Sequence, residues 1–302
     1  MGARPIIALL GIFASILPTL SVHRVYSEDY GLFQNHEIQC VIGNNAPKDE
    51  HQAGYNGLFR LTSIHQSKSL FVPSYAGLNL EHYFDGSNRG EDRDVLFEPR
   101  RAPMIFEKTG ENSAELYQPP TPVWQVESKT LFRLSNPYYI DVTVRCIPRK
   151  DHFQGCALGL FWASYINNPA DKSMYFLKAH GESLMWQQFC TQYHNHDSTI
   201  KHVNDSFEWA FDPQAPTMLF TETSPIRFSE PFFYGRFENM VFIVMFEKPE
   251  GIRLSHSPSG GGLNETKDDA CPAWDFQWII PSPIAGKEYE MRYRAVYKEW
   301  AG

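Results

Sequence analysis

Apolar and polar residues alternate along much of the chain, and this alternation predicts many short strands. Between Tyr138 and Ile147, apolar residues occupy the even positions from 140 to 146, whereas polar residues occupy positions 141, 143 and 145. Successive side chains of an extended chain point to opposite faces, so the pattern indicates a half-buried strand. The continuous apolar segment Met240–Glu247 is typical of a central strand. Further strands are predicted at Gly57–Ser63, Lys129–Leu134, Phe276–Ile280 and Glu288–Tyr297.

Proline and glycine separate the predicted strands, as at Gln118–Pro122 and Ser282–Gly286. Helical periodicity is weak, and we expect short helical turns only at Pro169–Leu177 and Glu182–Gln192. The strands do not alternate with helical crossovers. The sequence therefore predicts an all-β fold, a large and mostly antiparallel β-sandwich or barrel-like sheet with few short helices.

The composition agrees with a large β domain. The 302 residues include 22 Phe, 15 Tyr and 7 Trp, and 42% are hydrophobic. This content excludes disordered, collagen-like and coiled-coil chains. No repeat is visible, and the flexible segment Ser255–Asp269 is expected to be a loop inside a domain. We therefore predict a single domain over residues 28–302.

The N-terminus has the features of an export signal. Arg4 precedes an almost wholly apolar stretch from Pro5 to Val22, and small residues near Ser27 suit a cleavage site. Residues 1–27 are therefore predicted to be a signal peptide, which would make the protein secreted or periplasmic. The alternative is an uncleaved N-terminal membrane anchor, since the apolar stretch is close to the length that spans a bilayer.

The net charge bears on which partners the protein can bind, and the cysteine content bears on disulfides and metal sites. The net charge of −8 and the scattered basic residues disfavour nucleic acid, which needs a basic surface. A local basic pocket could still bind an acidic sugar. The five cysteines leave at least one unpaired, although Cys146 and Cys156 could pair across a hairpin. Their spacing matches neither a zinc knuckle nor a redox motif, so most are expected to be buried.

Several segments resemble, in their order, the galactose mutarotase-like (aldose epimerase-like) supersandwich superfamily, and also uncharacterised secreted bacterial proteins. The segments are Tyr55–Gly57, Leu70–His82, Trp124–Leu134, Leu158–Asn167, Pro272–Gln277 and Gly286–Tyr289. The resemblance implies a supersandwich fold and a sugar ligand. Aldose epimerases use a His as acid and a late Glu as base. Here the corresponding segment Trp162–Tyr165 lacks a His and no late Glu has a matching context, so the fold is expected without the epimerase pair.

The densest polar cluster is Tyr193–Ser198. On a strand, His194 and His196 would point to the same face, as an acid/base pair or two metal ligands require. The cluster is therefore an exposed polar hairpin, a sugar-facing acid/base site or a metal site.

A second cluster joins Glu81 and His82 with Asp85, which begins a turn. Carboxylates that flank a His orient it and suit it to proton transfer. The alternative is a hydrogen bond that stabilises the turn.

Aromatic residues beside polar ones suggest a sugar surface, because a ring stacks on a pyranose while polar neighbours bind its hydroxyls. Core packing is the alternative for each ring. On a regular strand, Trp274 and Phe276 face away from Asp275 and Gln277. Arg236 could bind a substrate carboxylate, or form a surface ion pair.

These observations predict an exported carbohydrate-binding or carbohydrate-active protein, with a His as general acid/base of a sugar epimerase, lyase or hydrolase. The alternatives are a non-catalytic glycan-binding or assembly module and a metal-dependent β-fold enzyme. No motif calls for a cofactor, a serine nucleophile or a zinc-protease site. The candidate catalytic residues are His82, His194, His196 and His256, and the candidate substrate-binding residues are Trp162, Tyr165, Arg236, Trp274, Asp275 and Gln277.

Overall fold

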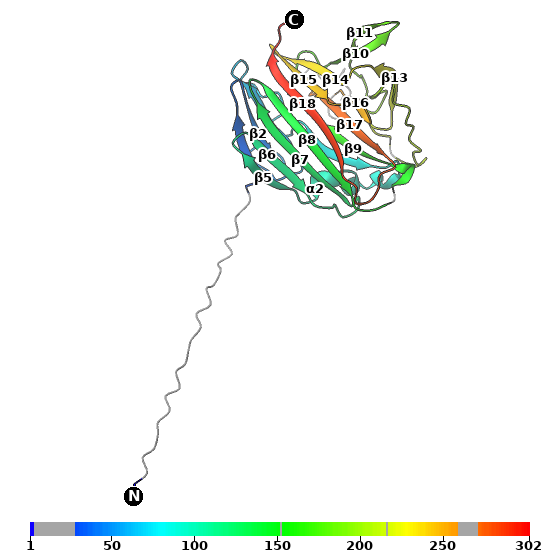
Figure 1. The fold of residues 1–302 in the computed structure, drawn as a ribbon. Coiled ribbons are helices and arrows are strands. Elements are labelled where there is room, and N and C mark those ends of the chain that lie inside the picture. The colour runs from blue at the N-terminus through cyan, green and yellow to red at the C-terminus, as the bar shows by residue number, and fades with distance from the viewer. Residues whose placement is uncertain (3–27, 152, 216, 259–270) are drawn as a thin grey trace.

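A computed structural model describes residues 1–2, 28–151, 153–215, 217–258 and 271–302 (Figure 1). Most of the predicted signal peptide and much of the predicted loop Ser255–Asp269 lie outside these residues. In the part of the chain that is described, no helix is both long and apolar enough to cross a membrane.

The described residues form three β-sheets. The nine-stranded sheet has the order β11 (Ser183–Phe189), β10 (Met174–His180), β14 (Phe232–Phe237), β15 (Met240–Phe246), β18 (Tyr289–Glu299), β8 (Tyr139–Pro148), β7 (Val126–Ser135), β6 (Ser113–Gln118) and β5 (Ile105–Gly110). The six-stranded sheet has the order β13 (Thr223–Phe228), β12 (Thr199–His202), β16 (Ile252–Ser257), β17 (Ala273–Pro281), β9 (Ala157–Ala163) and β4 (Asn79–Phe84). The third sheet consists of β1 (Tyr30–Gln34), β2 (Ile38–Gly43) and β3 (Gly57–Ser63).

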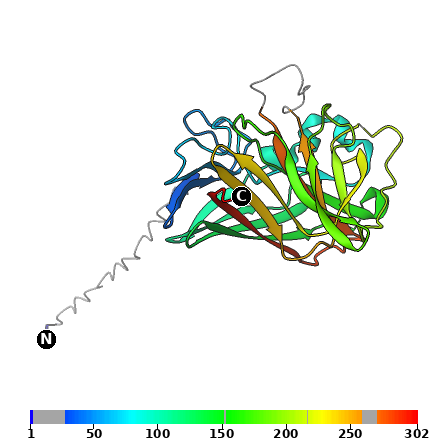
Figure 2. The ribbon, with the colours of Figure 1, turned by 90° about the horizontal axis from the view of Figure 1, so that it is seen from above.

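The two large sheets form a sandwich, and Figure 2 shows them from above. The main core lies between them and combines apolar side chains from both, such as Val142 and Val144 of β8 with Leu160 and Trp162 of β9. All described strand pairs except β12–β13 are antiparallel. The predicted all-β sandwich is therefore confirmed.

Most predicted strands are present, but the predicted helical turns are wrong. Residues 57–63 form β3 as expected, and the segments near 129, 138, 240, 276 and 288 lie in β7, β8, β15, β17 and β18. The two expected helical turns instead form the hairpin β10–β11, in which Met174 pairs with Phe189 and His180 with Ser183. Gly181 makes the turn with a φ of 62°. Met174, Phe176 and Phe189 reach the core from this hairpin, which a period of two permits.

The second face of the six-stranded sheet, which points away from the nine-stranded sheet, is covered by a smaller apolar cluster. Phe84, Phe161 and Ile279 on this face pack with Leu219 and Phe220. The cover comes from two segments. One contains the helical turns η1 (Asn88–Glu91), α1 (Arg93–Leu96) and α2 (Glu98–Arg101). The other, residues 205–215 and 217–222, is called the covering segment below. A further turn, η2 (Gln154–Cys156), precedes β9.

The proposed pairing of Cys146 with Cys156 is wrong, because neither cysteine forms a disulfide. Cys146 is fully buried on β8, where burial raises its pKa, whereas Cys156 is exposed in η2. The two side chains therefore occupy different environments.

Candidate functional site

Polar side chains form a row across the second face of the six-stranded sheet. The strand registers align Lys201, Arg253, Gln277 and His82 from β12 to β4, with the apolar Phe161 of β9 between the last two. Phe161 and His82 both contact Phe220 of the covering segment, which places the row on that face. Buried polar groups cost free energy unless each is hydrogen-bonded, so the partners of this row define its structure.

A second row lies beside the first. Thr199, Ser255 and Asp275 align on β12, β16 and β17. The side-chain amide Nε2 of Gln277 donates to the hydroxyls of Thr199 and Ser255, at 2.8 Å each. The backbone amide of Ser164 donates to Oδ1 of Asp275 at 2.9 Å. These contacts fix polar groups in a sheet interior that apolar residues would otherwise fill.

A β-bulge in β4 adds Glu81 to this face. Leu80 pairs with Trp162 and His82 pairs with Phe161, so Glu81 is the extra residue of the strand. A regular strand would place Glu81 and His82 on opposite faces, but a bulge removes that alternation. Both side chains now lie on the same side, 3.1 Å apart between Nε2 of His82 and Oε1 of Glu81.

Four groups surround the buried Glu81 carboxylate. The Tyr165 hydroxyl donates to Oε2 at 2.8 Å and the Asn79 amide donates to the same oxygen at 2.9 Å. Nη1 of Arg100 lies 3.6 Å from Oε2. Burial by itself would raise the pKa of Glu81, but the hydrogen bond and charge of His82, with the charge of Arg100, outweigh it and lower the pKa. Glu81 is thus held as a carboxylate.

Both ring nitrogens of His82 face oxygen acceptors. Nδ1 lies 3.0 Å from the Leu96 carbonyl, and Nε2 faces Glu81. An imidazole donates to two acceptors only when both nitrogens carry a proton. The Leu96 carbonyl and Glu81 thus fix the His82 ring from both sides, and the ring in turn orients the Glu81 carboxylate.

Asp275 and Tyr165 have pKa values that are shifted in the direction opposite to that of Glu81. Burial raises the pKa of Asp275 well above its ordinary value, and the negative charge of Glu81 adds to the effect. Burial likewise raises the pKa of Tyr165, which is therefore a neutral hydroxyl. Two carboxyl groups whose pKa values are shifted in opposite directions form the arrangement that separates a base from an acid.

His194 lies at the edge of the cluster. Its Nδ1 is 3.1 Å from the Ser257 hydroxyl, and burial lowers its pKa. Glu81 raises this pKa and His82 lowers it further, both by less than burial does. His194 is thus a half-buried imidazole held by Ser257 of β16.

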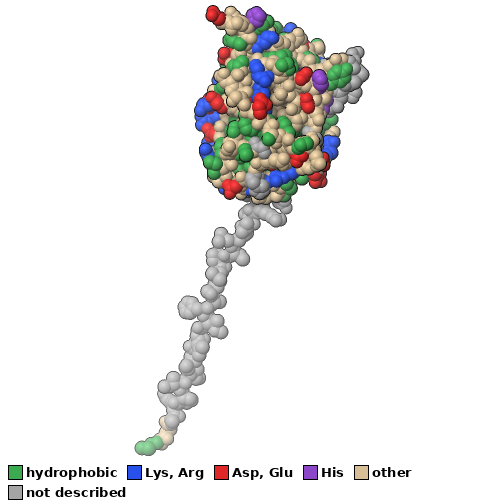
Figure 3. All heavy atoms as spheres, turned by 90° about the vertical axis from the view of Figure 1, so that its right-hand side faces the viewer, with side chains coloured by type: hydrophobic (Ala, Val, Ile, Leu, Met, Phe, Trp, Pro, Cys, Tyr) green, Lys and Arg blue, Asp and Glu red, His purple; other side chains and the backbone are tan. Residues whose placement is uncertain are grey.

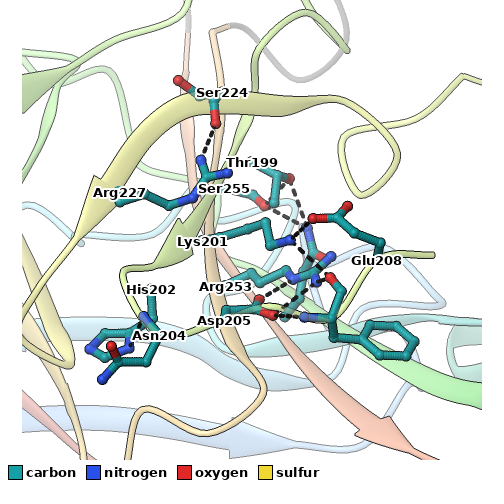
Figure 4. Close-up of polar contacts among 12 residues, drawn as sticks. Thr199, Lys201, His202, Asn204, Asp205, Glu208, Ser224, Arg227, Arg253 and Ser255 are labelled. Carbon is teal, nitrogen blue, oxygen red and sulfur yellow. Dashed lines mark hydrogen bonds and ion pairs between the residues drawn. The ribbon is translucent and has the colours of Figure 1, made fainter.

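At the other end of the first row, the covering segment holds two buried cations (Figure 4). Lys201 and Arg253 each have a side chain that is only 1% exposed. Nε of Arg253 donates to Asp205 at 2.7 Å, and Nζ of Lys201 donates to Glu208 at 2.6 Å. The Phe207 carbonyl accepts from both cations. These contacts fasten the covering segment to the sheet.

An open cleft of about 630 Å³ lies beside the Glu81 cluster. Arg93, Arg100 and Arg101 line it together with Tyr55 and Phe97. Arg100 belongs to both regions, since its guanidinium lies near Glu81 and stacks over Tyr55 at 3.8 Å. The cleft volume is within the range of small-molecule sites.

Five predicted site residues lie on this face: His82, Tyr165, His194, Asp275 and Gln277. The other two histidines do not join them. His196 is exposed, because Asn195 and Asp197 have positive φ values and make a turn instead of the expected strand. His256 is fully buried toward the other face, where Nε2 lies 2.9 Å from the Lys172 carbonyl.

The proposed sugar-stacking role of two tryptophans is contradicted by their burial. Trp162 and Trp274 are fully buried in the main core, and Trp162 stacks on Phe276. Their strand parity directs them between the sheets, away from Asp275. Arg236 is exposed on β14 and its guanidinium lies over Trp300, so it too is remote from the polar face.

Sequence patterns missed the contribution of Arg100 and Tyr55. The close spacing of Arg93, Arg100 and Arg101 is the sequence feature that indicates a basic pocket here. Asp85, in contrast, has the structural role expected of a turn residue, since it accepts from the amides of Ser87 and Gln154. Among the residues that the structure describes, no group of three His, Cys, Asp or Glu could hold a metal ion.

No protein-family model and no curated protein matches the sequence. Solved structures do resemble the fold. A candidate aldose 1-epimerase from Escherichia coli K12 has a TM-score of 0.50 and 9% identity, over 90% of this chain and 99% of that one. The Slr1438 protein of Synechocystis sp. PCC 6803 has a TM-score of 0.50 and 8% identity, over 90% and 96%. A galactose mutarotase-like protein from Lactobacillus casei ATCC 334 has a TM-score of 0.48 and 8% identity, over 89% and 99%. The two likenesses with a TM-score of 0.50 show that the chain shares the fold of those two proteins, at 8–9% identity.

Proposed function

We propose that the protein is a carbohydrate-active enzyme that transfers protons to and from a sugar bound beside Glu81. One observation carries the proposal: the buried Glu81 carboxyl, which faces His82 and Arg100, has a lowered pKa, whereas burial raises the pKa of the Asp275 carboxyl on the same face. Such a pair supplies a base and an acid at neutral pH. The fold likeness to a candidate aldose 1-epimerase supports a sugar as the substrate.

The residues take separate roles in this proposal. Glu81 accepts the proton, and the Tyr165 hydroxyl and the His82 ring orient its carboxylate. Asp275 donates a proton. Sugar epimerases, lyases and hydrolases all need this acid and base, so the proposal covers the three reactions. His82 then acts as a positioning residue.

Activity with matched variants tests the proposal. The purified protein is incubated with a panel of mono- and oligosaccharides, and NMR follows anomeric exchange, unsaturated products and new reducing ends. We expect Glu81→Gln and Asp275→Asn to lower turnover about 10²- to 10⁴-fold, the usual contribution of a general acid or base. Glu247→Gln, at an exposed position, is the control and should leave turnover unchanged. Equal turnover in Glu81→Gln and the wild type would refute the assignment.

A non-catalytic glycan-binding module is the second candidate. The rings of Tyr55, Tyr75 and Tyr165 cluster with centroids 4.9–5.7 Å apart beside the cleft, and aromatic rings are the usual partners of sugar faces. This function predicts glycan binding without turnover, and Tyr55→Ala would weaken that binding.

We also propose export, because the N-terminal sequence combines a basic residue, an apolar stretch and small residues near Ser27. N-terminal sequencing of the protein from its native host tests this. A mature chain that begins near residue 28 is expected, and retention of residues 1–27 would contradict cleavage.

A further inference from the structure

We propose that the cleft beside Glu81 recognises an anionic sugar through its carboxylate, as in a uronic acid, in preference to a neutral sugar. This inference rests on the proposed carbohydrate function and names the substrate class for the same site.

The charge of the cleft differs from that of the whole chain. The protein has a net charge of −8, yet the cleft lining contains Arg93, Arg100 and Arg101 and no acidic residue. Another open cleft is balanced, since it has Lys68 and Lys172 with acidic side chains among its lining residues. On the face shown in Figure 3, basic and acidic side chains are likewise interspersed. The three arginines exceed the two carboxylates that contact them, Glu81 and Asp94, and a concave site with an excess of one sign attracts a ligand of the opposite sign.

The guanidinium of Arg100 is already fixed in position before such a ligand binds. Its guanidinium stacks on Tyr55, with the Phe97 ring centroid 4.9 Å away, and Nε donates to the Gly54 carbonyl at 3.0 Å. These contacts fix the plane of the group. A fixed planar guanidinium binds a carboxylate with two parallel hydrogen bonds, which a neutral hydroxyl cannot reproduce.

The two other arginines add exposed charge at the cleft. Arg101 pairs with Asp94, but both side chains are more than half exposed. Arg93 lies over Phe97 at 5.2 Å and forms no ion pair among the described residues. Arg93 can therefore bind a ligand carboxylate without breaking an ion pair of its own.

The backbone that carries the arginines is also fixed. The side-chain amide of Asn45 donates to the carbonyls of Arg100 and Ala102, at 2.9 and 2.7 Å. The buried Glu98 carboxylate accepts from the Val123 and Trp124 amides at 2.6 and 2.9 Å. A site on an anchored segment does not need to be ordered when the ligand binds.

The geometry also orients the ligand. Glu81 is a carboxylate at the inner side of Arg100, so it repels a second carboxylate placed there. The ligand carboxylate would then bind the edge of the Arg100 guanidinium that faces away from Glu81, toward Arg93 and Arg101, with the sugar ring beside Tyr55. This orientation brings the uncharged part of the ring toward Glu81.

Binding measurements on matched ligands test the inference. Isothermal titration calorimetry compares tetrasaccharides of galacturonate, glucuronate and mannuronate with their carboxyl-reduced, neutral counterparts. We expect at least one uronate to bind about tenfold or more tightly than its neutral counterpart, because a charge-assisted contact is lost on reduction. The double variant Arg93→Gln/Arg101→Gln should lose this preference. Arg292→Gln, an exposed arginine on the nine-stranded sheet, is the control and should keep it.

The outcomes separate the inference from the proposed function. If no uronate binds more tightly than its neutral counterpart, the inference is refuted. Turnover of a neutral sugar that depends on Glu81 would in that case leave the proposed function standing. If a uronate binds preferentially but Glu81→Gln changes no turnover, the anionic ligand class is supported and the catalytic proposal fails.

Discussion

Removal of the Asp205 carboxylate should strongly destabilise the protein. Asp205 is the ion-pair partner of Arg253, with Nε–Oδ2 and Nη2–Oδ1 distances of 2.7 and 3.4 Å, and both side chains are at most 8% exposed. Asp205→Ala leaves a buried guanidinium without its counter-charge beside the buried Lys201. Loss of one partner from a buried ion pair costs about 3–5 kcal/mol. For a chain of this size, 1 kcal/mol shifts Tm by about 2 °C, so we expect a decrease of about 6–10 °C.

Thermal unfolding followed by circular dichroism measures this effect. If Asp205→Ala does not fold, Asp205→Asn serves as the second variant, because it removes the charge and keeps the shape of the side chain. Glu208→Gln is the matched control: Glu208 pairs with Lys201 but its side chain is 80% exposed, and an ion pair screened by water contributes about 1 kcal/mol or less. Equal Tm values for the Asp205 and Glu208 variants would refute the argument that burial decides the cost.

Two further predictions concern other parts of the fold. Gly251→Ala should lower the free energy of unfolding by about 3 kcal/mol or more, because a Cβ at this φ of 74° would lie 2.2 Å from the Ile279 carbonyl oxygen. Gly286 has a similar φ of 79° but open space around it, so Gly286→Ala should show only the backbone cost of about 1–2 kcal/mol. Urea unfolding of both variants measures the difference. Burial lowers the pKa of His256 to about 4, so the unfolded state binds its proton first as pH falls. Stability should therefore be fully present above pH 6.5 and fall by about 3 kcal/mol as pH decreases to 4. Urea unfolding at several pH values should show a smaller loss in His256→Asn, and an unchanged one in the exposed control His196→Asn.

The fold could be predicted where the side-chain pattern alone sets which face is buried. The even positions from 140 to 146 enter the core of β8 as their alternation required, and Met240–Phe246 is largely buried in the middle of its sheet. The hairpin Met174–Phe189 was misread as helical turns, because its second strand is mostly exposed and shows little apolar alternation. There the pairing between strands, a tertiary interaction, selected the extended conformation.

The site could be predicted only in part. The sequence by itself determined that Asp275 and Gln277 face away from Trp274 and Phe276, because strand parity is a local property. The sequence also predicted Glu81 and His82 as a cluster of a carboxylate and an imidazole. Only the tertiary structure decided that these two side chains share a face, because the bulge in β4 arises from pairing with β9. Likewise, Tyr165 and Arg100 meet Glu81 from distant parts of the chain. The opposite pKa shifts of Glu81 and Asp275 depend on burial and on those neighbours, and neither is encoded at a single position of the sequence.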